Sequence, residues 1–367
     1  MKIIDKYILN KILTTFFFVV LILVAIVSVI DLTEKMDKYS RNNLDTLTIL
    51  SYYADFIPWI AGLITPITVF IAIVFVTSQM AARTEIIAIL GSGVSFVRML
   101  FPYFVGALIL AVISFYLNGW IIPKSNRSRL DFEMRYLNKN VNYDKQNVHM
   151  QVEPNVYLYL QNYNNQSNIG YQFTLERFNE NNQLIEKLTA DNIQWDSAIN
   201  KWTLRQWRRK KVDSLFLVKN SNELNHLVES GLSKDTTLAI LPKDFTNVQS
   251  NYDGLTIPEL GEQIAKMKFR GATGVEIFQT ERHIRFASPF TIFVLVFMGV
   301  IVSARKSRGG TGFQIALGFL LSFVFILFFM MTRTFAEAGS LSPWMAAWLP
   351  NLSFAVIALG MYKFVPR

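Results

Sequence analysis

The stretch QMAARTEIIAILGSG, residues 79–93, carries the charged side chains Arg83 and Glu85 between two long apolar runs. Its spacing predicts a helix over about residues 80–92, roughly three turns long. An apolar stripe beside one acidic residue suits a helix that docks on a protein partner. A helix lying among lipid headgroups has the same pattern, and the spacing leaves both interpretations open. The residues expected to share the apolar face are Ala82, Ile86, Ile89 and Gly93.

Patterns for most catalytic chemistries are absent from the sequence. The chain has no cysteine, which excludes disulfides, thiolate metal sites and cysteine nucleophiles. Its three histidines, His149, His226 and His283, lie far apart without the spacing of metal ligands. No GxxxxGK[ST] loop occurs, and the glycine-rich GGTG at residues 309–312 is interpreted as a turn. We therefore predict that the chain is not an enzyme and carries no cofactor or metal of its own.

The composition indicates a membrane protein. Hydrophobic residues make up 51% of the 367 residues and charged residues only 17%, against about 25% charged residues in soluble domains. A hydrocarbon core needs roughly 20 apolar residues as helix. The first such run could be a signal peptide, but it is too long and lacks a cleavage site of small residues. The six predicted spans are Ile12–Ile30, Phe56–Ser78, Phe96–Ile122, Phe286–Ala304, Phe313–Thr332 and Trp344–Tyr362.

The net charge of +9 follows from basic residues near the ends of these spans, so it does not require a nucleic-acid partner. If all six runs cross the membrane, four basic places fall on one side, which the positive-inside rule makes cytoplasmic. Both termini and the 79–93 stretch are then expected inside. These basic places are Lys2, Lys6 and Lys11; Arg83 with Arg98; Arg305, Lys306 and Arg308; and Lys363 with Arg367.

Residues 123–282 are polar and are expected on the outer side. VYLYLQNY, YQFTLERF and KWTLRQWRR alternate as strands do, with polar turns between them, which favours an antiparallel sandwich or roll. Tryptophans 195, 202 and 207 are expected to pack in its core or at its edge. LTIPELGEQIAKMKFRG then predicts one amphipathic helix with Pro258 in its first turn and Gly271 at its end. The predicted domains are 1–122 with three spans, 123–282 with the strands, and 283–367 with three more spans.

Seven segments in order, with the right spans between them, carry a family resemblance. They are KIIDKYIL, TEIIAILGSGVS, LNGWIIPKSN, DGLTIPEL, ERHIRFASPF, RGGTGFQIALGF and LSPWMAAWLPNLSF. The chain resembles the LptF/LptG permease family, the membrane subunits of the lipopolysaccharide-exporting ABC transporter, across essentially its whole length. The resemblance implies a polytopic α-helical membrane protein with six transmembrane helices (3+3) and an inserted periplasmic antiparallel β-jellyroll domain.

The resemblance also implies partners. A heterodimer of LptF and LptG would surround a cavity in the inner membrane of a Gram-negative bacterium, and two copies of the ATPase LptB below it would hydrolyse ATP. LptC, a bitopic protein, would relay lipopolysaccharide that enters between the first span of one subunit and the fifth of the other. The 79–93 stretch matches the family's coupling helix, and Glu85 matches the glutamate that meets LptB. The expected coupling residues are Glu85, Arg83, Ala82, Ile86, Ile89 and Gly91.

Residues at the outer ends of the first and fifth spans are candidates for contact with the lipid. Lys35, Lys38 and Arg333 are expected at headgroup height, where they could pair with lipid A phosphates or extend toward ordinary headgroups. The acidic neighbours Asp31, Glu34 and Glu337 weaken the phosphate interpretation. Apolar side chains lower in the same spans would contact the acyl chains. The candidates for that contact are Phe17, Val20, Val24 and Phe325.

Two other functions remain open at this stage. A different ABC-type permease, serving lipoprotein release or mechanical signalling, usually has four spans, whereas this chain shows six. A membrane enzyme would need polar catalytic groups at the spans, and the spans offer mainly serine, threonine and Asn118.

Overall fold

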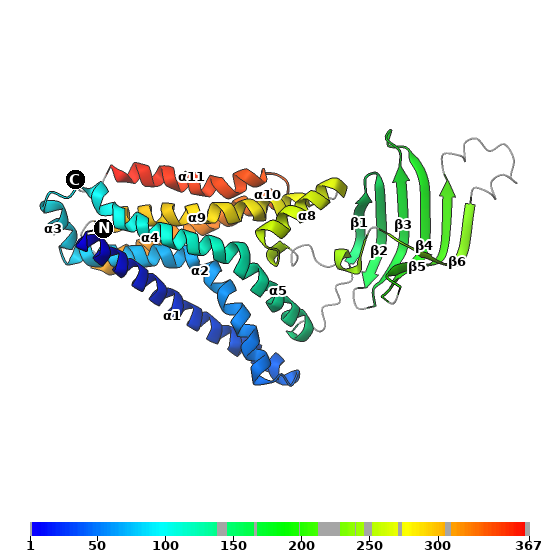
Figure 1. Ribbon diagram of the computed structural model, residues 1–367, viewed down its shortest axis with the longest axis horizontal. Coiled ribbons are helices and arrows are strands. Elements are labelled where there is room, and N and C mark those ends of the chain that lie inside the picture. Colours follow the sequence, from blue (N-terminus) through cyan, green and yellow to red (C-terminus); the bar gives the residue numbers. More distant parts are fainter. Residues whose placement is uncertain are drawn as a thin grey trace. The chain divides into compact units, whose positions relative to one another are not determined.

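The chain folds into two compact units in the computed structural model. One unit is helical and the other is built on a β-sheet (Figure 1). The helical unit comprises Met1–Asn138, Tyr252–Leu260 and Glu276–Arg367, and the sheet unit comprises Lys139–Asn251 and Gly261–Val275. The structure describes residues 2–137, 145–164, 167–197, 199–211, 228–238, 240–245, 252–270, 274–304 and 310–363. His226, Gly271, Gly309, the basic residues 305, 306 and 308, and Arg367 lie outside these ranges.

Among the described residues, six helices are long and apolar enough to cross a membrane, which confirms the predicted spans. Most are longer than predicted, because polar residues extend them beyond the hydrocarbon-length runs. Helix α1, with 39 residues, is roughly 58 Å long at 1.5 Å per residue, about twice the thickness of a hydrocarbon core. The helices are α1 (Ile3–Arg41), α2 (Thr46–Ala82), α4 (Phe96–Tyr116), α9 (Val275–Ser303), α10 (Gly310–Glu337) and α11 (Pro343–Tyr362).

The third span continues past the predicted boundary at residue 122. The π-helical turn η1 (Leu117–Ile121), helix α5 (Ile122–Phe132) and the turn η2 (Glu133–Leu137) extend it without a break, and all belong to the helical unit. The polar residues of α5 led to their assignment to the β domain, but α5 packs against α2, where its Arg129 stacks over Trp59. The segment Tyr252–Leu260 also belongs to the helical unit. Helix α8 (Ile257–Arg270) begins there, with Pro258 in its first turn as predicted.

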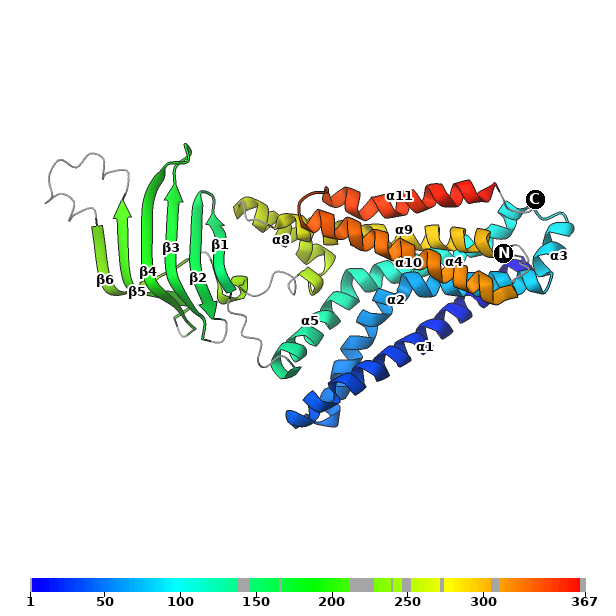
Figure 2. The ribbon, with the colours of Figure 1, turned by 180° about the vertical axis from the view of Figure 1, so that it is seen from behind.

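Helix α2 lies at the centre of the helical unit, where glycines let α9 and α10 approach it closely. A Cβ atom on Gly299 of α9 would lie 2.9 Å from the Ile73 side chain, and one on Gly318 of α10 would lie 3.0 Å from Phe70. Small residues at such contacts are typical of membrane helices, whose association depends on close packing. Figure 1 and Figure 2 show α1 and the first half of α2 diverging from α10 and α11. Pro58 and Pro66 lie inside α2, which bends along its length.

The described part of the sheet unit contains six antiparallel strands in sequential order. The antiparallel pairing confirms the predicted β domain. A jellyroll has two sheets with crossing connections, and the described strands instead form one meandering sheet. Trp202 is fully buried, and its Nε1 donates to the carbonyl of Ile240 at 2.9 Å. The strands are β1 (Lys145–Glu153), β2 (Val156–Asn164), β3 (Ile169–Phe178), β4 (Leu184–Asp196), β5 (Lys201–Lys211) and β6 (Val228–Thr236).

A crease crosses the sheet where the alternation of side chains is interrupted. On β2, Leu160 and Tyr163 are both buried although they are three residues apart, so Gln161 and Asn162 between them both face away from the core. The same interval separates inward-facing residues on the next three strands. These pairs are Gly170 and Phe173, Ala190 and Ile193, and Leu204 and Trp207.

Left-handed backbone accompanies the crease on alternate strands. Asn147 of β1, Gln172 of β3 and Gln206 of β5 have φ values of 53°, 54° and 50°. Such local irregularities bend a strand and are uncommon at residues other than glycine. The bend turns the apolar residues on both sides of the crease toward one interior.

The close contact between α2 and α9 predicts a stability effect. Gly299→Val should lower the stability of the helical unit by about 1–3 kcal/mol, because the added atoms force Ile73 aside in a packed region. Thermal unfolding in detergent measures the effect. Gly360→Val in α11 is the matched control, since a Cβ atom there meets nothing within 4 Å. Equal melting temperatures for the two variants would contradict this packing.

Candidate functional site

Helix α3 (Glu85–Gly91) connects α2 to α4 at one end of the helical unit. The N-terminus and the end of α11 lie at the same end, while α5 and the start of α8 lie at the opposite end (Figure 1, Figure 2). The predicted three-turn helix is shorter in the structure, with seven residues. Thr84 adopts a left-handed conformation with φ 60° and separates α3 from α2. Ala82 therefore ends α2, and Arg83 lies in the turn.

The predicted coupling residues divide between two faces. Ile86 is buried and Ile89 half-buried against the core of the helical unit, so Ile86 is not available to a protein partner. Ala82, Arg83 and Gly91 are exposed. Ile87, which was not predicted, has 61% of its surface exposed beside them. With two adjacent isoleucines, the local spacing did not show which one faces inward.

Glu85 is held by α1 rather than left free. Its Oε2 accepts a hydrogen bond from the Tyr7 hydroxyl at 3.1 Å and lies 3.5 Å from Lys11 Nζ. Nearby, Asp5 takes a bidentate pair from Arg98 at 2.9 and 2.7 Å. The first turns of α1 are thereby joined to both α3 and α4. Sequence spacing could not reveal these contacts, whose members lie 78 and 93 residues apart.

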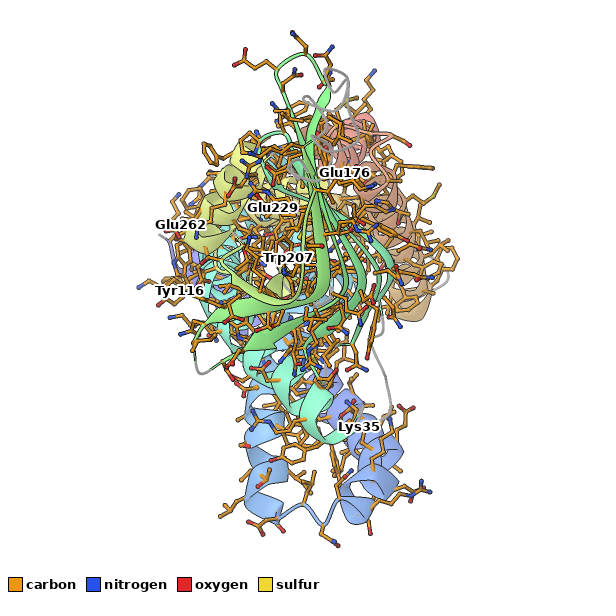
Figure 3. All side chains as sticks on the ribbon, turned by 90° about the vertical axis from the view of Figure 1, so that its right-hand side faces the viewer. Lys35, Tyr116, Glu176, Trp207, Glu229 and Glu262 are labelled. Atoms are coloured by element: carbon orange, nitrogen blue, oxygen red, sulfur yellow. The ribbon has the colours of Figure 1, made fainter. Side chains whose placement is uncertain are left out.

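Lys35 lies in a polar cluster that joins α1, α2 and α5. Its Nζ is 2.7 Å from Asp31, 2.5 Å from the Tyr52 hydroxyl and 3.4 Å from Glu133. Glu133 Oε1 also accepts hydrogen bonds from Tyr52 and from Arg129 Nη1, each at 2.8 Å. The Arg129 guanidinium is nearly buried and stacks over Trp59 at 4.0 Å. Figure 3 labels the Lys35 side chain. Its carboxylate partners neutralise the positive charge of Lys35, which would otherwise attract a phosphate.

The other two predicted cations differ from each other. Lys38 is exposed one turn further along α1. Arg333 on α10 is paired, with its Nε 2.8 Å from Glu337 and its Nη2 3.2 Å from Glu281. The structure therefore gives Lys38 the freest position of the three, while Lys35 and Arg333 each contact two carboxylates.

Two of the four predicted acyl-chain residues are buried within the chain itself. Val24 packs with Tyr52, Phe56 and Ile60, and Phe325 packs in the α10–α11 core. Both positions are wrong for lipid contact, because these spans are apolar all round and show no inward face. Val20 is half-buried and Phe17 is exposed. The outer faces carry other large residues, including Phe18, Leu21, Phe323 and Leu327.

The first and fifth spans are the least covered of the six. Only 17% of the apolar window of α1 and 22% of that of α10 is buried within the chain, against 33–56% for the other four.

Residues 6–363 match the family model described as "Lipopolysaccharide export system permease LptF/LptG". The chain belongs to the LptF/LptG family. It is therefore an inner-membrane permease subunit of lipopolysaccharide export.

Two curated relatives agree with this membership. Both are named "Lipopolysaccharide export system permease protein LptG", one from Escherichia coli K12 and one from Escherichia coli O6:H1. Each is 20% identical over 360 residues, which covers 98% of this chain and 97% of the relative. The likeness thus extends over the spans and the inserted sheet together. Members of the LptF/LptG family serve transport as part of an export system with partners.

The Glu133 cluster predicts a stability effect in this LptF/LptG subunit. Glu133→Ala leaves the nearly buried Arg129 and the half-buried Lys35 without a shared acceptor, which should cost on the order of 2 kcal/mol. Thermal unfolding in detergent measures the loss. Glu180→Ala in the exposed β3–β4 turn is the control and should leave the melting temperature unchanged. A Glu133 variant as stable as this control would mean that the cluster contributes nothing.

Proposed function

We propose that this chain forms one half of a permease in which ATP hydrolysis by a separate ATPase dimer drives lipopolysaccharide out of the inner membrane. A second LptF/LptG-type subunit would complete the cavity, and an LptC-like bitopic protein would receive the lipid. Both termini and α3 would be cytoplasmic, and the sheet unit periplasmic. The positive charge at the α3 end, from Lys6, Lys11, Arg83 and Lys363, supports this orientation.

The low coverage of α1 and α10 is the observation that carries the proposal. Many large apolar side chains on these helices remain about half exposed or more in the described part of the chain, so a sibling subunit or a lipid must cover them. Transfer of an acyl chain from bilayer to such a surface changes little free energy, because both environments are apolar. The exposed face of α1, with Phe17, Phe18 and Leu21, and that of α10, with Phe323 and Leu327, can each therefore pass the lipid along without trapping it.

The cations at the far ends of α1 and α10 would meet the phosphates of the lipid. Lys38 is exposed and can donate to a phosphate directly. Lys35 and Arg333 must exchange a carboxylate partner for the phosphate, which makes their binding depend on competition with Glu133 and Glu281. This exchange would favour a doubly charged group over the singly charged headgroups of ordinary lipids.

Helix α3 would bind the ATPase and move with its conformational change. Arg83, Ile87 and Gly91 form the exposed surface, and Glu85 stands at its edge in contact with α1. A basic side chain of the ATPase could form a charge-assisted contact with Glu85. Because Tyr7 and Lys11 hold the same carboxylate, movement of α3 would be transmitted to α1.

Loss of Glu85 should uncouple the transporter. In the reconstituted complex, Glu85→Ala should reduce lipopolysaccharide release by about tenfold or more, since removing one partner of a desolvated pair costs roughly 2–5 kcal/mol. Release from proteoliposomes and ATP hydrolysis are measured in parallel. Glu180→Ala removes an exposed glutamate from the sheet unit and is the control. Normal release by the Glu85 variant would refute the coupling role.

Crosslinkers placed on the exposed faces of α1 and α10 should react with the substrate. A photo-crosslinking amino acid at Phe18 of α1 or Phe323 of α10 should capture lipopolysaccharide during turnover. Val356 and Leu359 of α11 are matched controls, because they are apolar and at least as exposed but lie on a different span. Equal capture from all four positions would indicate contact with bulk lipid and would contradict a path along α1 and α10.

A further inference from the structure

The segment Tyr252–Leu255 is held by arginines from three helices. It lies after the strands in the sequence and leads directly into α8. Arg127 of α5 donates to the carbonyl of Gly254 at 2.9 Å and contacts Glu259 at 3.1 Å. Arg285 of α9 and Arg333 of α10 both contact Tyr252 of the segment. The chain that returns from the sheet is therefore fixed to helices on several sides.

Arg285 forms the buried side of this attachment. It is only 5% exposed, and its guanidinium donates to the carbonyls of Leu255 and of Tyr252, the latter at 3.2 Å. Its Nε donates to Glu281 Oε1 at 2.9 Å, one turn earlier on α9. A guanidinium presents its donors in a rigid fork, so these contacts fix the backbone of the segment against α9. This side has little freedom to open.

Arg333 contacts the same segment from α10 and is more exposed. Its Nη2 donates to the Tyr252 hydroxyl at 3.3 Å and lies 3.2 Å from Glu281 Oε2. That carboxylate oxygen makes no well-directed hydrogen bond, so the contact is one of charge alone. The shortest bond of Arg333 stays within α10, to Glu337 at 2.8 Å. The links from α10 to the segment are thus the weaker ones and can separate while Arg285 keeps its partners.

We propose that Arg333 is a positioning residue that fastens the end of α10 to the Tyr252–Leu255 segment and releases it during transport. This inference rests on the proposed function, because it assumes that α10 moves as lipid enters. Its consequence is that the motion of a weakly covered span reaches the chain leading to the sheet through one guanidinium. Glu281 takes part by holding Arg285 and Arg333 at its two oxygens.

Asp253 gives the attachment a pH dependence. Burial raises the pKa of the Asp253 carboxyl from 3.8 to about 6, and Glu281 of α9 adds to the rise. Arg333 of α10, Arg285 of α9 and Arg129 of α5 act in the opposite direction. Because Arg333 lowers this pKa, release of Arg333 would raise the pKa further, so the fastened state binds a proton less tightly than the released state. The attraction between Asp253 and Arg333 is therefore present when the carboxyl is ionised, and it is lost as pH falls through about 6.

A distance measurement tests the fastening in the full chain in nanodiscs. The sequence has no cysteine, so spin labels at Pro258→Cys and Phe335→Cys, both exposed, report only this pair of sites. We expect one narrow distance distribution that broadens in Arg333→Gln and is largely restored in Arg333→Lys. Lowering the pH from 8 to 5 should broaden it in the parent chain but not in Asp253→Asn. An unchanged distribution in Arg333→Gln would overturn the proposal.

A transport measurement distinguishes a positioning role of Arg333 from a role in phosphate binding. In the reconstituted complex, Arg333→Gln and Glu281→Gln should each lower lipid release per ATP, by about fivefold for an ion pair of this exposure. The double variant should be no worse than either single one. If Arg333 served only to bind phosphate, Glu281→Gln would leave release intact, and that result would contradict the inference. Failure of the parent complex to release lipid would refute the proposed function but leave the distance test standing.

Discussion

Charges near a bilayer must find opposite charges, and this constraint organises the helical unit. An unpaired ion is costly near hydrocarbon, and removal of one member of a buried pair is strongly destabilising. The chain meets this requirement by pairing across helices. Arg98 binds Asp5, Glu133 joins Lys35 to Arg129, and Glu281 joins Arg285 to Arg333. Contacts made for neutrality therefore also decide which helices are fastened together and at which end.

The sequence predicts the elements well because their signals are local. Long apolar runs reveal the spans, and alternation reveals the strands. The cross-helix pairs are invisible to such patterns, since Lys35 and Glu133 are 98 residues apart. Apolar spans also lack a polar face, which is why Val24 and Phe325 were placed wrongly. The polar sequence of α5 resembled the insert, although its Arg129 and Asn126 are buried and Arg129 stacks over Trp59 of α2.

The sheet follows a different rule from the helices. Its strands need one apolar side, and strict alternation would keep that side flat. On β2 the alternation is broken by two successive outward residues, Gln161 and Asn162. Gly170 fits this crease because a Cβ atom there would lie 2.8 Å from Leu160. Figure 3 labels Trp207, whose ring is 4.4 Å from Lys234 Nζ on the neighbouring strand.

The length of α1 gives it leverage. Glu85 and Arg98 hold its first turns, while Lys35 and Tyr39 lie near its far end. Over a rigid rod of roughly 58 Å, a tilt of about 5° displaces the distant tip by roughly 5 Å. A small tilt of α1 at the end beside α3 would therefore displace its opposite end by a distance comparable to the width of an acyl chain.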